Sequence, residues 1–393
     1  MENIDKADVA SKHSFKMLFP IGKGGFGKVW KVSHKKSAIE YAMKEISKVK
    51  LYLKKSIPLI NQELLTLKSI RNFFIANIHY AFQNEEYLYI VTDYFPGGDL
   101  RYHINSRYCK RFSLNEIRFI LGCVILALVY LRKHNIIHRD IKPDNLVFDS
   151  KGYLHLTDFG VSKCINNSYQ GIVDKSGTIG YASPEAVLGL KQSFTTDYFA
   201  LGVIAYELLV GCRPFRGRNK TQIKEQMITK TVQLKPEDIH HCSSDSKESE
   251  IVCDFVNSLL QRKVHNRLGS QGIEDIIYHP FFEEFDWNAL YNQEIISPFQ
   301  LRQGECYKNS ELYNDDSNNS VLNADEYYDI LNRINNNNKC FVKFYYDSRN
   351  KEDKEQCKAS HANDLSLYDF ECFHKLKSTK RNSGVSLLST KSE

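Results

Sequence analysis

A polar run between residues 138 and 145 carries the most specific chemical signal in this chain. The spacing HRDxxxxN is filled by His138, Arg139, Asp140 and Asn145. Four fixed residue types at this spacing arise by chance in only about a few chains per thousand. Asp140 can accept the proton of a substrate hydroxyl, and Asn145 can bind a metal ion. A loop of ordinary turn residues is the alternative, and the next motif makes it the weaker interpretation.

A second acidic motif, Asp158-Phe159-Gly160, follows 18 residues after Asp140. The residues between the two motifs predict a short hairpin around Gly152. Because Mg²⁺ favours oxygen ligands and phosphate, the Asp158 carboxylate is suited to hold a magnesium ion that bridges nucleotide phosphates. The motif is common by itself, but its order and spacing after HRDxxxxN are not.

A glycine-rich turn has the pattern GxGxxGxV over residues 22–29. Glycines there let backbone amides approach phosphate oxygens without an intervening Cβ. The pattern alone is weak, because three fixed glycines occur by chance in roughly one chain of this length in twenty, and an ordinary hairpin turn would explain them. A dinucleotide-binding turn is excluded, because the next element is predicted to be a strand rather than a helix.

One lysine lies on the strand that is predicted after this turn. Ala42 and Lys44 share a face of that strand, so we expect the Lys44 ammonium to point inward, where a charge is costly unless it is paired. Nucleotide phosphates and Glu63, from the following helix, can supply the opposite charges. A solvent-exposed lysine would be the ordinary interpretation if the other motifs were absent.

The elements that position these motifs change type along the chain. Alternating apolar residues predict strands around 29–32, 41–44 and 88–91, interrupted by a helix where Ile60, Leu64 and Leu67 recur. From residue 99 to about 282 helices dominate. The predicted fold is therefore α+β and bilobal, with a β-rich small lobe over residues 15–96 and a larger, mostly helical lobe over 97–282.

Two further segments flank these lobes. An extension covers residues 1–14, and a tail rich in Asn, Ser and charged residues covers 283–393. Much of the tail is expected to be mobile, because it lacks the apolar content that offsets chain entropy.

Residues 15 to about 282 resemble the catalytic domain of protein kinases, whose motifs occur here in the order of that family. Ser183-Pro184-Glu185 stands where the family usually has Ala-Pro-Glu, and Phe199 replaces a tryptophan of the large lobe. Both departures are structural. Lys142 and Thr178 match the serine/threonine branch of the family.

Within that branch, residues 97–103, 285–287 and 297–299 resemble the AGC kinases. The YANK subgroup is the closest likeness. The resemblance implies magnesium-dependent transfer of the γ-phosphoryl group of ATP to Ser or Thr hydroxyls of proteins.

The resemblance also assigns roles to residues of the site. The implied catalytic residues are Asp140, Lys142, Asn145 and Thr178. The implied metal ligands are Asn145 and Asp158. The implied nucleotide-binding residues are Ile21, Gly22, Lys23, Gly24, Gly25, Phe26, Gly27, Lys28, Val29, Ala42, Lys44, Glu63, Thr92, Asp93, Phe95, Asp99 and Val147.

Three acids bear on substrate choice. In the AGC kinases that prefer basic peptides, acids at three sites contact arginines that precede the target hydroxyl, and those sites here hold Asp99, Asp144 and Glu207. We therefore expect a preference for Arg two or three residues before the phosphorylated residue, through charge-assisted hydrogen bonds. The alternative is that Asp99 contacts only the ATP ribose and that Glu207 has only a structural role.

The tail contains a candidate docking motif. Phe370 and Phe373 resemble the two aromatic residues of the AGC hydrophobic motif, which dock on the small lobe beside the helix that carries Glu63. An undocked tail is the alternative, since FxxF is a common pattern in a chain with 23 phenylalanines.

A single aspartate bears on regulation. Asp174 stands where AGC kinases usually carry a phosphorylated threonine, and the usual cationic partners are retained as Arg139 and Lys163. A carboxylate carries less charge than a phosphate, so Asp174 is expected to bias the loop toward its ordered form without locking it. Phosphorylation of Ser176 and a solvated aspartate are the alternatives.

Composition bears on the other functional classes. The net charge of +6 is mild and a solvated tail explains the basic C-terminal residues, so no nucleic-acid partner is expected. Ten cysteines without a CxxC pair indicate reduced thiols in the cytoplasm, with nuclear entry left open.

The longest apolar run, Cys123 to Leu131, predicts a buried core helix rather than a membrane span. The chain is expected to be a monomer. An inactive scaffold on the same fold is the main rival, although every chemical group of the site is present.

Overall fold

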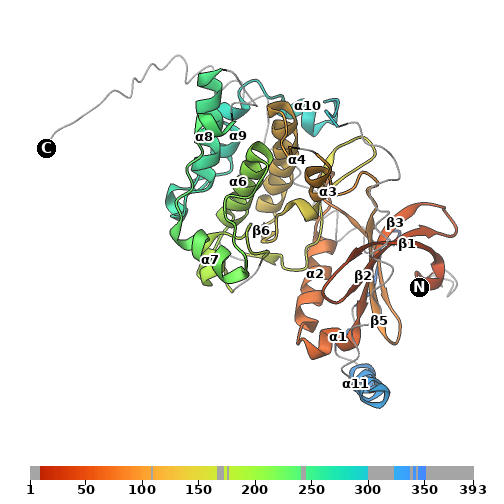
Figure 1. The fold of residues 1–393 in the computed structure, drawn as a ribbon. Coiled ribbons are helices and arrows are strands. Elements are labelled where there is room, and N and C mark those ends of the chain that lie inside the picture. Colours follow the sequence, from red (N-terminus) through yellow and green to blue (C-terminus); the bar gives the residue numbers. More distant parts are fainter. Residues whose placement is uncertain are drawn as a thin grey trace.

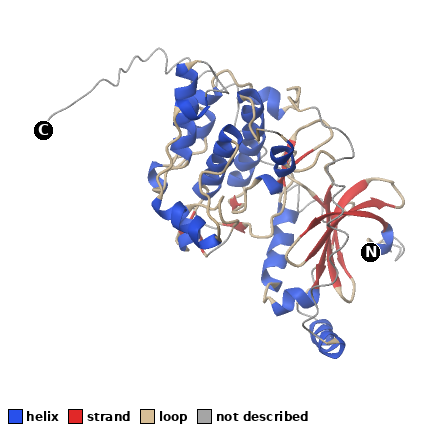
Figure 2. Ribbon diagram, in the orientation of Figure 1, coloured by secondary structure: helices blue, strands red, loops and turns tan. Residues whose placement is uncertain are grey.

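The computed structural model has two lobes, one built on a β-sheet and one built of helices (Figures 1 and 2). It describes residues 9–107, 109–165, 172–174, 177–239, 245–299, 323–336, 340–341 and 344–350. In Figure 1 the strands lie on the right, near the N-terminus, and the helices of the large lobe gather on the other side. The α+β, bilobal fold predicted from the sequence is confirmed.

A six-stranded sheet in the order β1-β2-β3-β5-β4-β12 forms the small lobe. Its strands are β1 (Phe15–Lys23), β2 (Gly27–His34), β3 (Glu40–Ser47), β4 (Ile78–Gln83), β5 (Tyr87–Asp93) and β12 (Tyr346–Asp347). β2 and β3 are antiparallel, and Val29 lies opposite Lys44. Because side chains alternate between the faces of a strand, Ala42 shares the face of Lys44, whereas Met43 is fully buried on the other face.

Two helices follow β3. α1 (Lys48–Leu53) begins after Ser47, whose hydroxyl accepts the backbone N–H of Lys50, a favourable N-cap. α2 (Ile57–Ser69) is the helix predicted from apolar spacing, and its buried side chains are Ile60, Glu63, Leu64, Thr66 and Leu67. The helix therefore holds a buried carboxylate among its apolar residues.

The large lobe is built around α4 (Leu114–Lys133) and α6 (Thr195–Val210). α4 begins with a capping box between Ser113 and Glu116. By length and composition alone this helix could cross a membrane, but 83% of its apolar 18-residue stretch is buried inside the protein. α4 is thus the core helix that the sequence predicted.

Shorter elements complete the lobe. They are α3 (Leu100–Ser106), β6 (Ile136–Ile137), β7 (Leu146–Phe148), β8 (Leu154–Leu156), β9 (Lys163–Cys164), β10 (Ile172–Val173), α5 (Pro184–Leu188), β11 (Lys191–Gln192), α7 (Lys220–Thr229), α8 (Ser246–Leu259), α9 (Glu274–Ile277) and α10 (Trp287–Tyr291). Short 3₁₀ turns lie at Lys12–Ser14, Pro143–Asn145, Pro236–Ile239, Val264–Asn266 and Pro280–Phe282. The pair β7–β8 is the predicted hairpin between the two acidic motifs.

Part of the C-terminal tail packs on the small lobe. α11 (Ala324–Asn336) lies beside α1 (Figure 1), and β12 pairs with the strand β4. Phe341 and Phe344 are buried in this region. The FxxF pair selected from the sequence, Phe370 and Phe373, lies outside the described residues. A different FxxF pair therefore contacts the small lobe.

Candidate active site

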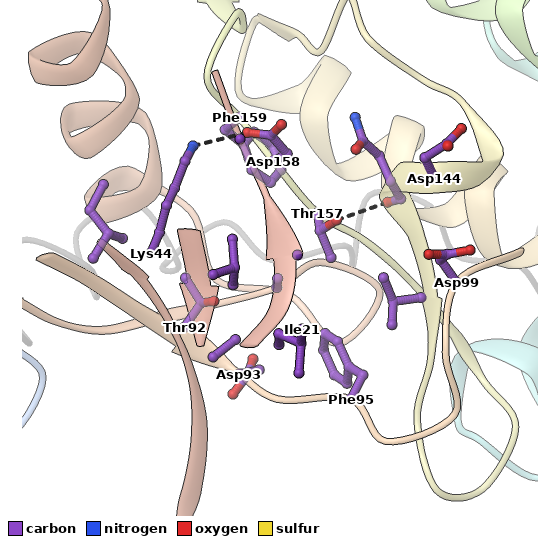
Figure 3. A pocket seen from close by; sticks show the side chains of 18 of the residues that line it. Ile21, Lys44, Thr92, Asp93, Phe95, Asp99, Asp144, Thr157, Asp158 and Phe159 are labelled. Carbon is purple, nitrogen blue, oxygen red and sulfur yellow. Dashed lines mark hydrogen bonds and ion pairs between the residues drawn. The ribbon is translucent and has the colours of Figure 1, made fainter. Parts of the chain in front are cut away.

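A cleft of about 610 Å³ takes its lining residues from both lobes (Figure 3), which is within the usual size of a ligand pocket. Most residues predicted for nucleotide or metal binding line it. They are Ile21, Gly22, Lys23, Gly24, Gly25, Val29, Ala42, Lys44, Glu63, Thr92, Asp93, Phe95, Asp99, Asn145, Val147 and Asp158, joined by the predicted catalytic residue Lys142.

Three predicted nucleotide-binding residues, Phe26, Gly27 and Lys28, are not among the described residues that line the cleft. Phe26 packs against the hydrophobic core, and the Lys54 ammonium lies 5.2 Å from the centre of its ring. Lys28 lies on the face of β2 opposite to Val29, as strand alternation requires. The side chains of the turn thus divide between the cleft and the body of the small lobe.

Gly27 is required by the packing of β2 on β3. A Cβ atom at this position would lie 1.7 Å from the backbone oxygen of Glu45. At Gly25, by contrast, a Cβ atom would meet no atom of the described residues within 4 Å. The third glycine of the motif therefore permits close strand contact, a role that the sequence analysis did not assign to it.

Lys44 is held by two carboxylates inside the cleft. Its ammonium lies 2.6 Å from Glu63 Oε1 and 3.2 Å from Asp158 Oδ1, and Figure 3 shows the side chain directed at Asp158. Burial lowers the pKa of Lys44, but the charges of Asp158 and Glu63 outweigh burial and raise this pKa above its ordinary value. The Lys44 charge lowers the pKa of Asp158 to about 2. The predicted pairing of Lys44 with Glu63 is present in the structure.

Asp140 is the centre of a hydrogen-bond network. Its Oδ1 accepts bonds from the backbone N–H of Thr178 at 2.8 Å and from the Thr178 hydroxyl at 2.7 Å. Its Oδ2 accepts bonds from Lys142 Nζ at 2.7 Å and from Asn145 Nδ2 at 3.1 Å. Lys142 Nζ also donates to the Thr178 hydroxyl at 2.8 Å. The structure brings all four predicted catalytic residues together, and the network fixes the Asp140 carboxylate.

The loop that carries Asp140 is anchored by α6. The backbone N–H groups of His138 and Arg139 donate to the two carboxylate oxygens of Asp197, each at 2.8 Å. Arg139 has a φ of 69°, which is uncommon for a residue with a side chain. At Gly177, which has a φ of +87°, a Cβ atom would lie 2.6 Å from the Arg139 carbonyl oxygen. This close approach places Thr178 beside Asp140.

Two oxygen-bearing side chains could hold a metal ion in the cleft. These are the Asp158 carboxylate and the Asn145 amide, which both line it. Asn145 Nδ2 donates to the Asp140 backbone oxygen at 2.9 Å, so the amide oxygen is the atom left for a metal. Carboxylate and amide oxygens are donors that Mg²⁺ accepts, with phosphate and water in the remaining positions. The donor set therefore fits magnesium.

The end of the cleft near β5 is lined by Thr92, Asp93 and Phe95 (Figure 3). The Asp93 carboxylate is bound by His79 Nε2 at 2.6 Å and by Asn77 Nδ2 at 2.9 Å. These bonds commit the side chain to a structural network. The nucleotide contact that the resemblance implies for Asp93 would therefore involve its backbone groups.

Sequence reasoning missed several residues of the cleft. They are Leu67, Ala76, Ile90, Tyr94, Thr157 and Phe159. Two of them had a usable signal, because Leu67 lies one helical turn after Glu63 and Ile90 lies two strand positions before Thr92. Ala76 comes from a loop, and no local pattern marks it.

The three acids predicted to bind substrate arginines differ in their surroundings. Asp99 lines the cleft and its Oδ1 accepts the backbone N–H of Tyr102 at 2.7 Å. The Asp144 side chain is 50% exposed. Glu207 is buried, and Arg101 Nη1 lies 2.9 Å from its Oε1. The hypothesis that Glu207 contacts a substrate arginine loses its support here, because an arginine of the chain itself already binds this carboxylate.

Comparison with known proteins relates this site to a family. Residues 15–282 match the family described as protein kinase domain. The chain is 37% identical over 279 residues to a probable serine/threonine-protein kinase of Dictyostelium discoideum, covering 71% of this chain and 59% of that protein. It is 37% identical over 297 residues to the serine/threonine-protein kinase sgk-1 of Caenorhabditis elegans, covering 74% and 60%.

A mammalian relative gives a similar result. The chain is 34% identical over 293 residues to the serine/threonine-protein kinase Sgk1 of Mus musculus, covering 74% of this chain and 65% of that protein. The matches thus span less than two thirds of the length of these three relatives. The family match contains every residue of the site described above. The chain therefore belongs to the protein kinase family.

Proposed function

We propose that this chain is a kinase that transfers the γ-phosphoryl group of ATP to Ser or Thr hydroxyls of proteins. The observation that carries this proposal is the network of Asp140, Lys142 and Thr178 next to a cleft that holds the Lys44–Asp158 ion pair. Phosphoryl transfer depends mainly on positioning and on charge stabilisation. The network supplies both.

Each residue has a role in this proposal. Lys44, fixed by Glu63, would bind the α- and β-phosphates. Asp158 and Asn145 would hold magnesium, which when bound neutralises charge on the phosphate oxygens. Asp140 would orient the substrate hydroxyl and accept its proton.

Two residues next to Asp140 complete the site. Lys142 would place a positive charge beside the transferred group. The Thr178 hydroxyl, which bonds both Asp140 and Lys142, would keep the two side chains in this arrangement.

We also propose a preference for substrates with a basic residue upstream of the phosphorylated position. Asp99 and Asp144 support it. Burial raises the pKa of Asp99, and the negative charge of Asp144 raises it further. A guanidinium bound between the two carboxylates would remove their mutual repulsion and gain charge-assisted hydrogen bonds.

The subgroup is a further proposal. Membership in the AGC kinases is supported by the relatives named sgk-1 and Sgk1 and by the tail segment that packs beside α1 and β4. The YANK likeness rests on residues 97–103, 285–287 and 297–299.

A transfer assay with labelled ATP tests the proposed function. The wild-type chain is expected to label a basic protein substrate on Ser or Thr, identified by phosphoamino-acid analysis. The variant Asp140→Asn is expected to lose about 100-fold or more in rate, the size of effect usual for a general base, and to bind Mg-ATP with unchanged affinity.

The control is Asp254→Asn, because the Asp254 side chain is 70% exposed and pairs with His279 outside the cleft. This variant is expected to keep the wild-type rate. If the wild type binds ATP but transfers nothing, the chain is a scaffold. Full activity of Asp140→Asn would remove the proposed mechanism.

A further inference from the structure

An arginine of the chain binds two carboxylates in a pocket next to the candidate active site. Arg101 lies in the first turn of α3. Its Nη1 is 2.9 Å from Glu207 Oε1, its Nη2 is 3.3 Å from Glu207 Oε2 and its Nε is 3.7 Å from Asp144 Oδ2. Nη2 also donates to the Tyr181 hydroxyl, which itself donates to Glu207 Oε2. The Arg101 guanidinium thus contacts the carboxylates of both Asp144 and Glu207.

This pocket adjoins the network of Asp140. It has a volume of about 390 Å³ and is lined by Arg101, Ile104, Asn105, Lys110, Asp144, Thr178, Tyr181, Glu207, Gly211 and Arg213. Thr178 belongs to both sites, because its hydroxyl bonds Asp140. A residue close to the phosphorylated one in a bound substrate would therefore reach the pocket.

The charges of the pocket disfavour a second guanidinium. Its lining contains three cationic side chains, Arg101, Lys110 and Arg213, and two carboxylates. An arginine from a substrate would enter a region of net positive charge and would have to displace Arg101. Two effects oppose this displacement. Glu207 is buried, so its charge is costly to leave unpaired while the arginines exchange. Arg101 belongs to the same chain as Glu207, so it competes at a much higher effective concentration than a free peptide.

We propose that Arg101 is a specificity-determining residue that takes the place of a substrate arginine at Glu207. This inference rests on the proposed kinase function and narrows its substrate class. The chain selects one upstream basic residue, which Asp99 and the exposed side of Asp144 bind. A second upstream basic residue contributes nothing, because among the described residues of the pocket Glu207 is already bound by Arg101.

Two peptides of equal length test the inference. One has a single arginine three residues before its serine, and the other has arginines two and three residues before it. The wild-type enzyme is expected to give KM values that agree within about twofold, since no new binding energy is gained. In Arg101→Leu the Glu207 carboxylate becomes accessible, so KM for the second peptide is expected to fall about tenfold below that for the first, with equal kcat for the two peptides.

Two variants control for other causes. Arg107→Leu removes an arginine at the other end of the same helix, where it pairs with Glu116 outside the pocket, and its KM ratio is expected to match the wild type. The double variant Arg101→Leu/Glu207→Leu removes the acid as well, and the advantage of the second arginine is expected to vanish. Arg101→Gln, which keeps a donor for Glu207 but not the charge, replaces Arg101→Leu if thermal melting shows that the latter does not fold.

The outcomes separate the two proposals. A tenfold preference of the wild type for the second peptide overturns the inference without any variant. The inference is also overturned if a folded Arg101→Leu or Arg101→Gln enzyme has equal KM values for the one-arginine and the two-arginine peptide. If the wild type phosphorylates neither these peptides nor a basic protein, the proposed kinase function fails instead.

Discussion

The Asp174 carboxylate accepts a hydrogen bond from the Arg139 guanidinium, which joins the segment after Asp158 to the HRD motif. Lys163 Nζ donates to the other carboxylate oxygen, and Gln192 Nε2 donates to the Asp174 backbone oxygen at 2.5 Å. Burial raises the pKa of Asp174, but the hydrogen bond from Lys163 and the charge of Arg139 outweigh burial and lower this pKa below its ordinary value. Asp174 is thus ionised at neutral pH and contacts both cationic partners expected from the sequence.

We predict from this contact that the enzyme is active without phosphorylation of this segment. Enzyme treated with phosphatase, and shown by mass spectrometry to carry no phosphate, is expected to keep most of its activity. Asp174→Asn keeps the shape of the side chain but removes its charge. It is expected to lose about threefold to tenfold in kcat, since a partly exposed ion pair contributes about 1 kcal/mol and 1.4 kcal/mol corresponds to tenfold.

Ser176→Ala is the control for the alternative in which a phosphorylated Ser176, outside the described residues, supplies the charge. This variant is expected to remain active. If phosphatase silences the wild type, or if Ser176→Ala is as inactive as Asp174→Asn, then Asp174 does not replace a phosphate.

A second prediction concerns the tail segment that contains Phe341 and Phe344. Lys68 Nζ, on the helix that carries Glu63, donates to the Tyr345 backbone oxygen at 2.5 Å. Removal of the two buried rings in Phe341→Ala/Phe344→Ala is therefore expected to loosen the segment and the helix together. Buried Phe→Ala changes cost about 3–5 kcal/mol in a core, so a fall in Tm of at least about 4 °C is expected even if only part of that cost applies. A reduced kcat should accompany it.

The matched control is Phe370→Ala/Phe373→Ala, which changes the pair that sequence reasoning selected. It is expected to leave Tm and kcat near the wild-type values. If Phe370→Ala/Phe373→Ala lowers Tm and kcat and Phe341→Ala/Phe344→Ala does not, the docking motif lies at 370–373. The tail contact at Phe341 then has no role in activity.

A third prediction separates two glycines of the same turn. Gly27→Ala would bring a Cβ atom within 1.7 Å of the Glu45 backbone oxygen, whereas a Cβ atom at Gly25 is not obstructed by described residues. Overpacking of this kind costs about 1–3 kcal/mol. Gly27→Ala is therefore expected to lower Tm by several degrees, at about 2–4 °C per kcal/mol, and Gly25→Ala to change it little. Thermal melts of the two variants that coincide would show that β2 can move away from β3.

The extent to which the sequence predicted this site follows from how each residue acts. In the proposed function Asp140, Asn145 and Asp158 act through the chemistry of their own side chains, so their types and spacing mark them directly. The role of Gly27 needed the position of Glu45 on a neighbouring strand, and no spacing rule contains it. The contact of Arg101 with Glu207 joins residues separated by 106 positions. It depends on how the chain folds, so no local sequence pattern could predict it.

The elements of the fold likewise divide into those with a local sequence pattern and those that depend on the assembled lobe. The helix around Glu63 and the core helix α4 were predictable because their apolar periodicity extends over several turns. β12 has only two residues, Tyr346 and Asp347, so it offers no period to detect. It forms because the strand β4 presents an edge to pair with, which is a property of the assembled lobe and not of the segment.

The final prediction concerns pH. The pKa of Asp158 is about 2 because of the Lys44 charge, against an ordinary value of 3.8. A lowered carboxylate pKa stabilises the folded state above about pH 4, and this contribution is lost as the pH falls toward 2.

Lys44→Met removes the positive charge that lowers the pKa of Asp158. Without nucleotide, the Tm of this variant should therefore lie below the wild-type Tm at neutral pH, and the difference between the two Tm values should shrink between about pH 5 and pH 3. The Asp158 side chain is 47% exposed, so solvent screening limits the share of Asp158 in this difference to about 1 kcal/mol, or about 2–4 °C. The loss of the cationic partner of the buried Glu63 carboxylate adds to the difference at neutral pH. Lys151→Met, in an exposed turn, is the control whose Tm difference should not vary with pH. A Tm difference for Lys44→Met that stays constant or grows on acidification would mean that lost packing of the lysine stem, and not its charge, separates the variant from the wild type.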